Sequence, residues 1–135
     1  MPDSARRPAP LIAQLTRIGL HHTNHCEDYT VVESLGGPRL LAAVLDGCTM
    51  GTDSYFAATL VGKLLRKTAV ELSYEAFYQP AASPTPAATL REVLRRLMAQ
   101  LRALKSDLQL RDDELLTTLL LAVVDTDTGA TEILA

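Results

Sequence analysis

The chain has 135 residues, enough for one domain, and 47% of them are hydrophobic, which excludes a wholly disordered protein. The formal net charge is −3 and only 4% of residues are aromatic, which argues against a nucleic-acid-binding protein with its basic and stacking surfaces. The longest apolar run, 119–124, is far shorter than the roughly 18 residues of a membrane span.

The N-terminal third of the chain contains a predicted β-hairpin. Residues 1–10 include three prolines and are expected to form a flexible lead-in to a domain spanning 11–135, and residues 16–20 fit a short strand. Residues 29–33 and 40–45 are predicted as two strands around a glycine pair. The second run is apolar on both faces, which favours a central strand, although a buried helical segment fits the same pattern.

Two helices are predicted in the middle of the chain. Apolar residues recur at helical spacing over 54–72, with Asp53 or Ser54 as the expected N-cap. A linker rich in Pro, Ala, Ser and Thr follows over 79–88. The apolar stripe over 90–104 then predicts an amphipathic helix that packs on the core, because it is too short to sustain the heptads of a coiled coil.

The C-terminal part contains a second pair of predicted strands. A polar turn at 111–114 precedes a strand at 116–124, a turn at 125–129 and a returning strand at 130–134. Strands, two helices and strands in this order predict an α+β fold with helices packed on an antiparallel sheet.

Acidic residues occur at the expected ends of the two hairpin strands. Glu27 and Asp28 come just before the first strand, and Asp46 and Gly47 come just after the second. These ends are neighbours at one edge of an antiparallel pair. Clustered carboxylates repel unless a cation offsets their charge, and Mg²⁺ and Mn²⁺ prefer oxygen ligands. The pattern therefore indicates a divalent-metal site, with a solvated turn as the alternative.

These residues also resemble a known family. The segment 24–28, the strand end at 43–47, and Gly51 before a helix are similar to the N-terminal half of the type 2C metal-dependent serine/threonine protein phosphatases. The strand at 117–124 is similar to the family's Thr-containing strand. The resemblance covers residues 16–135 and indicates a divergent branch, because 48–51 is longer and bulkier than the family's Gly-Gly turn.

The resemblance implies a fold and a mechanism. The family fold is an antiparallel β-sandwich flanked by helices, with two Mn²⁺ or Mg²⁺ ions between the sheets that activate a water for attack on phosphoserine or phosphothreonine. By position, Asp46 would bridge both ions, and Glu27 and the Gly47 carbonyl would hold one of them. Asp28 would support metal-bound water, and the partner would be a phosphoprotein substrate.

Two departures from the family pattern limit these expectations. The family's phosphate-binding arginine is replaced by Thr23, which offers no charged clamp. The remaining metal aspartates of the family lie in its C-terminal half, beyond Ala135. We therefore expect an incomplete sandwich that is catalytically weak or inactive and that self-associates through exposed sheet edges. The alternatives are an inactive phosphatase-like binding or regulatory module, and an unrelated α+β domain with surface carboxylates.

Histidines and cysteines near the carboxylates suggest further chemistry. His22 or His25 would hold phosphate in place of the missing arginine. A zinc site that also uses Cys26 and Cys48 is a weaker alternative, because the spacing matches no ordinary zinc module. A nucleophilic Cys48 lacks the arginine-bearing phosphate loop that it would need. Two cysteines form no disulfide framework, and without a visible signal peptide we expect a cytoplasmic protein.

Overall fold

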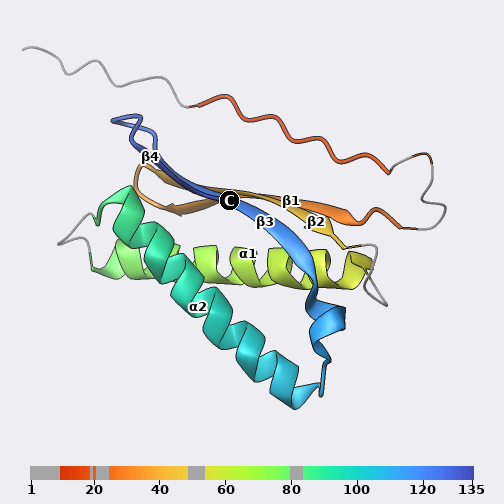
Figure 1. Ribbon diagram of the computed structural model, residues 1–135. Helices are drawn as coiled ribbons and strands as arrows, with labels where there is room; N and C mark the ends of the chain where they lie inside the picture. The colour runs from red at the N-terminus through yellow and green to blue at the C-terminus, as the bar shows by residue number, and fades with distance from the viewer. Residues whose placement is uncertain (1–9, 19, 21–24, 49–53, 80–83) are drawn as a thin grey trace, which may run out of the picture.

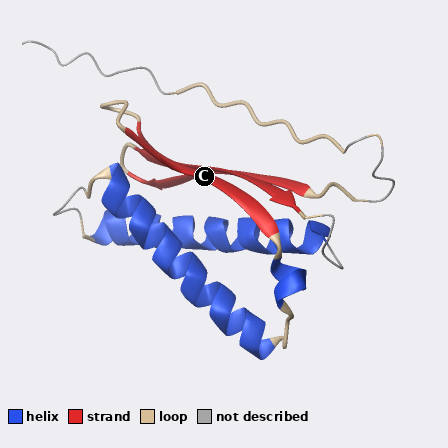
Figure 2. Ribbon diagram, viewed as in Figure 1, coloured by secondary structure: helices blue, strands red, loops and turns tan. Residues whose placement is uncertain are grey.

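The structure is a computed structural model that describes residues 10–18, 20, 25–48, 54–79 and 84–135. Its strands form one antiparallel sheet of four in the order β1-β2-β3-β4. Figures 1 and 2 show that both long helices lie on the same face of this sheet. In chain order the elements are β1 (Asp28–Gly36), β2 (Arg39–Gly47), α1 (Ser54–Tyr78), α2 (Pro86–Asp107), the 3₁₀ helix η1 (Asp112–Leu115), β3 (Thr117–Asp125) and β4 (Thr131–Leu134).

The β1–β2 hairpin is confirmed, and its turn is the predicted glycine pair. The register runs from Asp28 opposite Asp46 to Gly36 opposite Arg39. Gly36 and Gly37 have φ angles of 89° and 56°, a backbone region that residues with a side chain rarely adopt. The run 40–45 is a central strand, because β2 pairs with β1 on one side and with β3 on the other.

The core lies between the sheet and the two helices. Strand side chains alternate between faces, and the odd-numbered positions of β1, β2 and β3 face the helices. Fully buried residues from the strands meet fully buried residues from α1 and α2. The largest of them are Val31, Leu41, Leu45, Leu65, Val93, Leu97, Leu121 and Val123.

The opposite face of the sheet, called the open face here, carries apolar residues that remain accessible. It is formed by the even-numbered positions of β1, β2 and β3 together with Ile133, the cross-strand partner of Ala122. Val44, Leu120 and Ile133 are 51%, 46% and 62% exposed. Residues 10–18 run along this face (Figure 1), where the Thr16 and Thr30 hydroxyls lie 3.3 Å apart.

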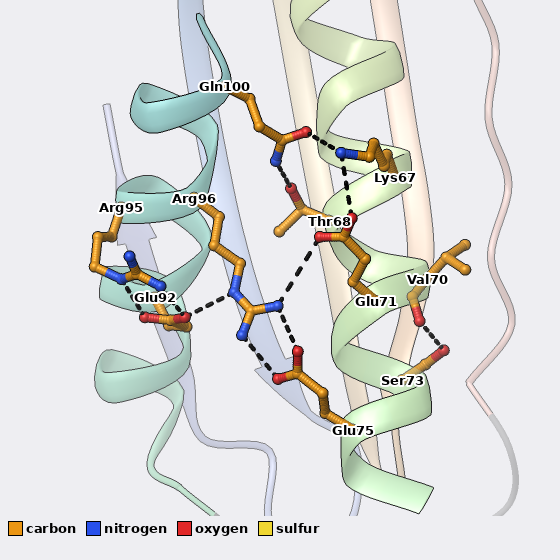
Figure 3. Close-up of polar contacts among 10 residues, drawn as sticks. All are labelled: Lys67, Thr68, Val70, Glu71, Ser73, Glu75, Glu92, Arg95, Arg96 and Gln100. Carbon is orange, nitrogen blue, oxygen red and sulfur yellow. Dashed lines mark hydrogen bonds and ion pairs between the residues drawn. The ribbon is translucent and has the colours of Figure 1, made fainter. Parts of the chain in front are cut away.

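A network of polar side chains joins α1 to α2 (Figure 3). The Arg96 guanidinium donates two hydrogen bonds to Glu75, at 2.8 and 2.7 Å, and one to Glu92 at 2.7 Å. Farther along the helices, Gln100 accepts from Lys67 at 2.9 Å and donates to the buried Thr68 at 3.0 Å. These contacts join α2 to α1 at two places along the helices.

Both helices differ from their predicted bounds. α1 continues past the predicted end at 72. Apolar periodicity did not predict this extension, because its aromatic residues Tyr74, Phe77 and Tyr78 are exposed and do not continue the buried stripe. α2 begins at Pro86, inside the predicted linker 79–88. Its start is stabilised by Thr85, whose hydroxyl accepts from the Ala88 amide at 3.2 Å, and proline suits the first turn of a helix.

The α+β fold with helices on an antiparallel sheet is confirmed, and the described residues contain one sheet of the expected sandwich. The predicted turn 111–114 is largely the 3₁₀ helix η1. In the predicted strand 16–20, residues 16–18 and 20 adopt no strand conformation. The lead-in up to residue 9, Gly19 and the proposed cap Asp53 lie outside the described residues. None of the described helices is long and apolar enough to cross a membrane.

Candidate functional site

The structure brings Glu27, Asp28, Asp46 and Gly47 to one end of the sheet. Asp28 and Asp46 are cross-strand partners in the β1–β2 register. The Gly47 amide donates to the Glu27 carbonyl oxygen at 3.0 Å, which continues the pairing by one step. The fold therefore supplies the convergence that a shared site requires, while the role of these residues as metal ligands stays a prediction.

The carboxylates of Asp28 and Asp46 point to the same side of the sheet. Opposed residues in an antiparallel ladder alternate between hydrogen-bonded and non-hydrogen-bonded pairs. Glu27 and Gly47 form a hydrogen-bonded pair, so the next pair, Asp28 and Asp46, is non-hydrogen-bonded. Directly opposed side chains in such a pair have Cβ atoms about 4.5–5.5 Å apart. Both residues are exposed, and alternation along β2 places Asp46 on the open face with Val44.

The first residues of β3 hold the backbone of Asp46. The hydroxyls of Thr117 and Thr118 lie 2.9 and 3.4 Å from the Asp46 carbonyl oxygen and donate to it. The Cys48 amide donates to the Leu116 carbonyl oxygen at 3.2 Å. The end of β2 is thus fixed from both neighbouring strands. Sequence reasoning gave these threonines no role, although two hydroxyl residues at a strand start were visible as a signal.

His25 lies on the other side of the sheet from the aspartate pair. Its ring stacks on Tyr55 in the first turn of α1, with the ring centroids 4.2 Å apart and the planes at 26°. The side chain therefore faces the helix layer, whereas Asp28 and Asp46 face the open side. The structure does not bring His25 together with the Asp28–Asp46 pair, and His22, the other predicted phosphate ligand, and Thr23 lie outside the described residues.

The described residues do not form a complete metal site by themselves. Among them, no group of three or more His, Cys, Asp or Glu side chains is arranged to hold an ion. Cys26 and Cys48, considered above for zinc, are half-buried free thiols. The carboxylate end of the sheet therefore contains one opposed pair of carboxylates, Asp28 and Asp46, with Glu27 next to Asp28 in the chain.

A cavity lies at the other end of the sheet. It has a volume of about 340 Å³ and lies beside the β1–β2 turn, with Pro38, Arg39 and Glu75 among its lining residues. Glu75 already pairs with Arg96. The cavity presents no opposed carboxylates, so the acidic end of the hairpin remains the better candidate for chemistry.

Comparison with known families supports a relationship over nearly the whole chain. The family model described as protein phosphatase 2C matches residues 19–134. The matched range contains every described helix and strand and all four residues of the carboxylate end. No curated protein and no solved structure matches the chain.

Proposed function

The chain belongs to the protein phosphatase 2C family, and we propose that its carboxylate end is part of a divalent-metal centre that hydrolyses phosphoserine and phosphothreonine in proteins. The observation that carries this proposal is the cross-strand pair of Asp28 and Asp46 inside the matched range. Two carboxylates opposed at one ladder position repel, and a bound cation that attracts both offsets this repulsion.

The donor atoms at this end fit Mn²⁺ or Mg²⁺, the ions that the family generally uses. Carboxylates from Glu27 and Asp46 and the Gly47 carbonyl are hard oxygen ligands of the kind both ions prefer. In this proposal Asp46 would hold both ions, and Glu27 and the Gly47 carbonyl would hold one of them. When bound, such ions neutralise phosphate charge and make a water more acidic.

The chain's own residues prepare this site in two ways. Thr117 and Thr118 fix the backbone of Asp46 through its carbonyl oxygen, so the carboxylate projects from a strand held on both sides. In this proposal Asp28, the cross-strand partner of Asp46, would accept a hydrogen bond from the attacking water and orient it.

We propose that the remaining ligands come from a second sheet that packs on the open face. Val44, Leu120 and Ile133 supply an accessible apolar surface for it on the side to which Asp46 points. With only part of the ligands, the 135-residue chain is expected to bind metal weakly and to be a weak or inactive phosphatase. Free thiols at Cys26 and Cys48 agree with a cytoplasmic location.

The proposal is tested by metal binding to the wild-type chain and to two matched variants. Calorimetric titration with Mn²⁺ should detect weak binding that Asp46→Asn abolishes. Glu132→Gln should leave binding unchanged, because Glu132 is an exposed strand carboxylate opposite Val123 and away from the site. Wild-type binding that survives Asp46→Asn contradicts the assignment.

Hydrolysis of p-nitrophenyl phosphate with Mn²⁺ tests the activity separately. We expect turnover close to background for this chain. Robust, metal-dependent turnover that Asp46→Asn abolishes would establish the phosphatase and overturn the expectation of a weak enzyme.

The second candidate is a phosphatase-like binding or regulatory module without catalysis. It is favoured by Thr23 at the position of the family's arginine, and by the lack of a three-ligand group within the described ranges. A module of this kind binds no Mn²⁺, so a flat titration with a folded wild-type chain would select it over the enzyme.

A further inference from the structure

Two cysteines flank the carboxylate end of the hairpin, one before β1 and one after β2. Cys26 precedes Glu27, and Cys48 follows Gly47. We propose that Cys26 and Cys48 form a reversible disulfide across the end of the β1–β2 pair. This inference concerns the thiols alone and does not depend on the proposed phosphatase function.

The register of the hairpin places the two cysteines opposite each other. Asp28 is paired with Asp46, and the 3.0 Å hydrogen bond from the Gly47 amide to the Glu27 carbonyl oxygen continues the ladder. The next step in the same register sets Cys26 opposite Cys48. The Cys48 amide donates to the carbonyl oxygen of Leu116, the residue before β3, so the backbone just past β2 is still held next to β3.

The type of pair suits a disulfide. Since Glu27 and Gly47 form the hydrogen-bonded pair, the next pair outward is non-hydrogen-bonded, like the aspartate pair on the other side. Cα atoms in such a pair are about 4.5 Å apart, and disulfides join Cα atoms separated by about 4.4–6.8 Å. The strands therefore need little adjustment to accept the bond.

The two side chains also share a side of the sheet. His25 packs on Tyr55 in the helix layer, so alternation along an extended backbone directs Cys26 toward the open side. Cys48 lies two residues after Asp46 and takes the same side. Both residues are half-buried, which leaves the thiols within reach of a small oxidant.

The reaction needs a two-electron oxidant of the hydroperoxide class. One thiol attacks a peroxide oxygen and becomes a sulfenic acid as the O–O bond breaks and water leaves. The second thiol attacks the sulfenic sulfur, forms the S–S bond and releases a second water. The cysteines together lose two electrons and the peroxide gains them, and a dithiol reductant reverses the bond by exchange.

The crosslink would join the pair of residues next to the Glu27–Gly47 pair, at the outer end of the hairpin. It would stop this end of the hairpin from fraying and would tie the two strands at the point where the aspartates face each other. Oxidation should therefore slow hydrogen exchange at the Gly47 amide, which donates to Glu27.

Peptide mapping after mild oxidation tests the proposal. The chain is treated with equimolar hydrogen peroxide and digested without reduction. We expect a crosslinked peptide pair containing Cys26 and Cys48, with a mass lower by two hydrogen atoms, and no disulfide-linked dimer on a non-reducing gel. Dithiothreitol should release the pair, and the melting temperature should rise on oxidation and fall back on reduction.

Cys26→Ser and Cys48→Ser are the matched controls. Each should fold as judged by circular dichroism, lose the crosslink and show no rise in melting temperature with peroxide. Should either serine variant fail to fold, the wild-type peptide map and hydrogen exchange at Gly47 still decide the question. Separate sulfinic acids on the two wild-type cysteines, or disulfides between chains, would overturn the proposal.

Discussion

Asp28 lies directly opposite Asp46 across β1 and β2, so two carboxylates occupy one ladder position at the exposed end of the hairpin. Opposed like charges destabilise a strand pair, and cross-strand pairs are worth roughly 0.2–1 kcal/mol. Without metal, Asp28→Asn should therefore raise the free energy of unfolding by an amount in that range. Urea denaturation in the presence of a chelator measures the change.

Glu132→Gln is the control for this substitution, because its cross-strand partner is Val123 and no like charge is relieved. It should leave the free energy of unfolding nearly unchanged. With Mn²⁺ present, the advantage of Asp28→Asn should shrink, since the cation already offsets the repulsion. If Asp28→Asn is less stable than the wild type when both are free of metal, the two carboxylates do not repel each other.

The position of this pair could be predicted from the sequence, because it depends only on local features. The glycine pair sets the turn, and antiparallel pairing then brings Asp28 and Asp46 to the same edge. The type and order of α1, α2, β3 and β4 followed from apolar periodicity for the same reason, whereas the predicted strand at 16–20 was wrong.

Longer-range details could not be predicted. The contact between Thr117 and the Asp46 carbonyl joins residues 71 positions apart, and it depends on the register of β2 and β3. The direction of His25 depends on its stacking with Tyr55 across the sheet–helix boundary. The last turns of α1 contact α2 through the ion pair between Glu75 and Arg96. A contact of this kind leaves no signal in the apolar periodicity of α1.

The open face should promote self-association. Val44 is 51% exposed and faces its cross-strand partner Leu120, which is also accessible. Apolar strand surfaces of this kind associate in water, and a central charge opposes that contact. Val44→Lys should lower the fraction of oligomer measured by sedimentation velocity, while the circular dichroism spectrum stays unchanged.

Val70→Lys is a matched control for that experiment. Val70 is 49% exposed, so the gain in surface charge is the same, but it lies on α1 in the helix layer. It should leave the oligomer fraction unchanged. Equal effects from both substitutions would indicate a general effect of charge and would exclude the open face as the contact surface.

Gly62 permits close packing between α1 and β1. A Cβ atom at this position would lie 2.2 Å from the Tyr29 ring, which is itself held under the Arg66 guanidinium. Overpacking of this kind costs about 1–3 kcal/mol, more than the gain of at most ~1 kcal/mol from replacing a helical glycine with alanine. Gly62→Ala should therefore destabilise the protein in chemical denaturation.

A double-mutant cycle with Tyr29→Val identifies the cause. Once the ring is removed, Gly62→Ala should become neutral or stabilising by up to ~1 kcal/mol, because only the helix-propensity term remains. If Gly62→Ala lowers the free energy of unfolding equally in the wild-type and Tyr29→Val backgrounds, a clash with Tyr29 is not the reason that glycine is needed at position 62.

Stability in acid should depend on the Arg96 network. Hydrogen bonds from Arg95 and Arg96 lower the pKa of Glu92 from its usual 4.5 to about 2, and a hydrogen bond from Arg96 lowers the pKa of Glu75. Carboxyls with a lowered folded-state pKa add stability that is fully present above about pH 4.5. They lose it as the pH falls toward 2, because the unfolded chain takes up protons first.

Arg96→Met tests this link. At pH 7 the variant should be less stable than the wild type, and the two stability curves should converge as the pH falls from 4.5 toward 2, because protonation of the wild-type carboxyls weakens their pairing with Arg96. Arg91→Met is the control, because Arg91 is an exposed α2 residue with no ion pair among the described residues. Its curve should stay parallel to that of the wild type. A constant gap between Arg96→Met and the wild type down to pH 2 would mean that Arg96 acts through packing rather than through its carboxylate partners.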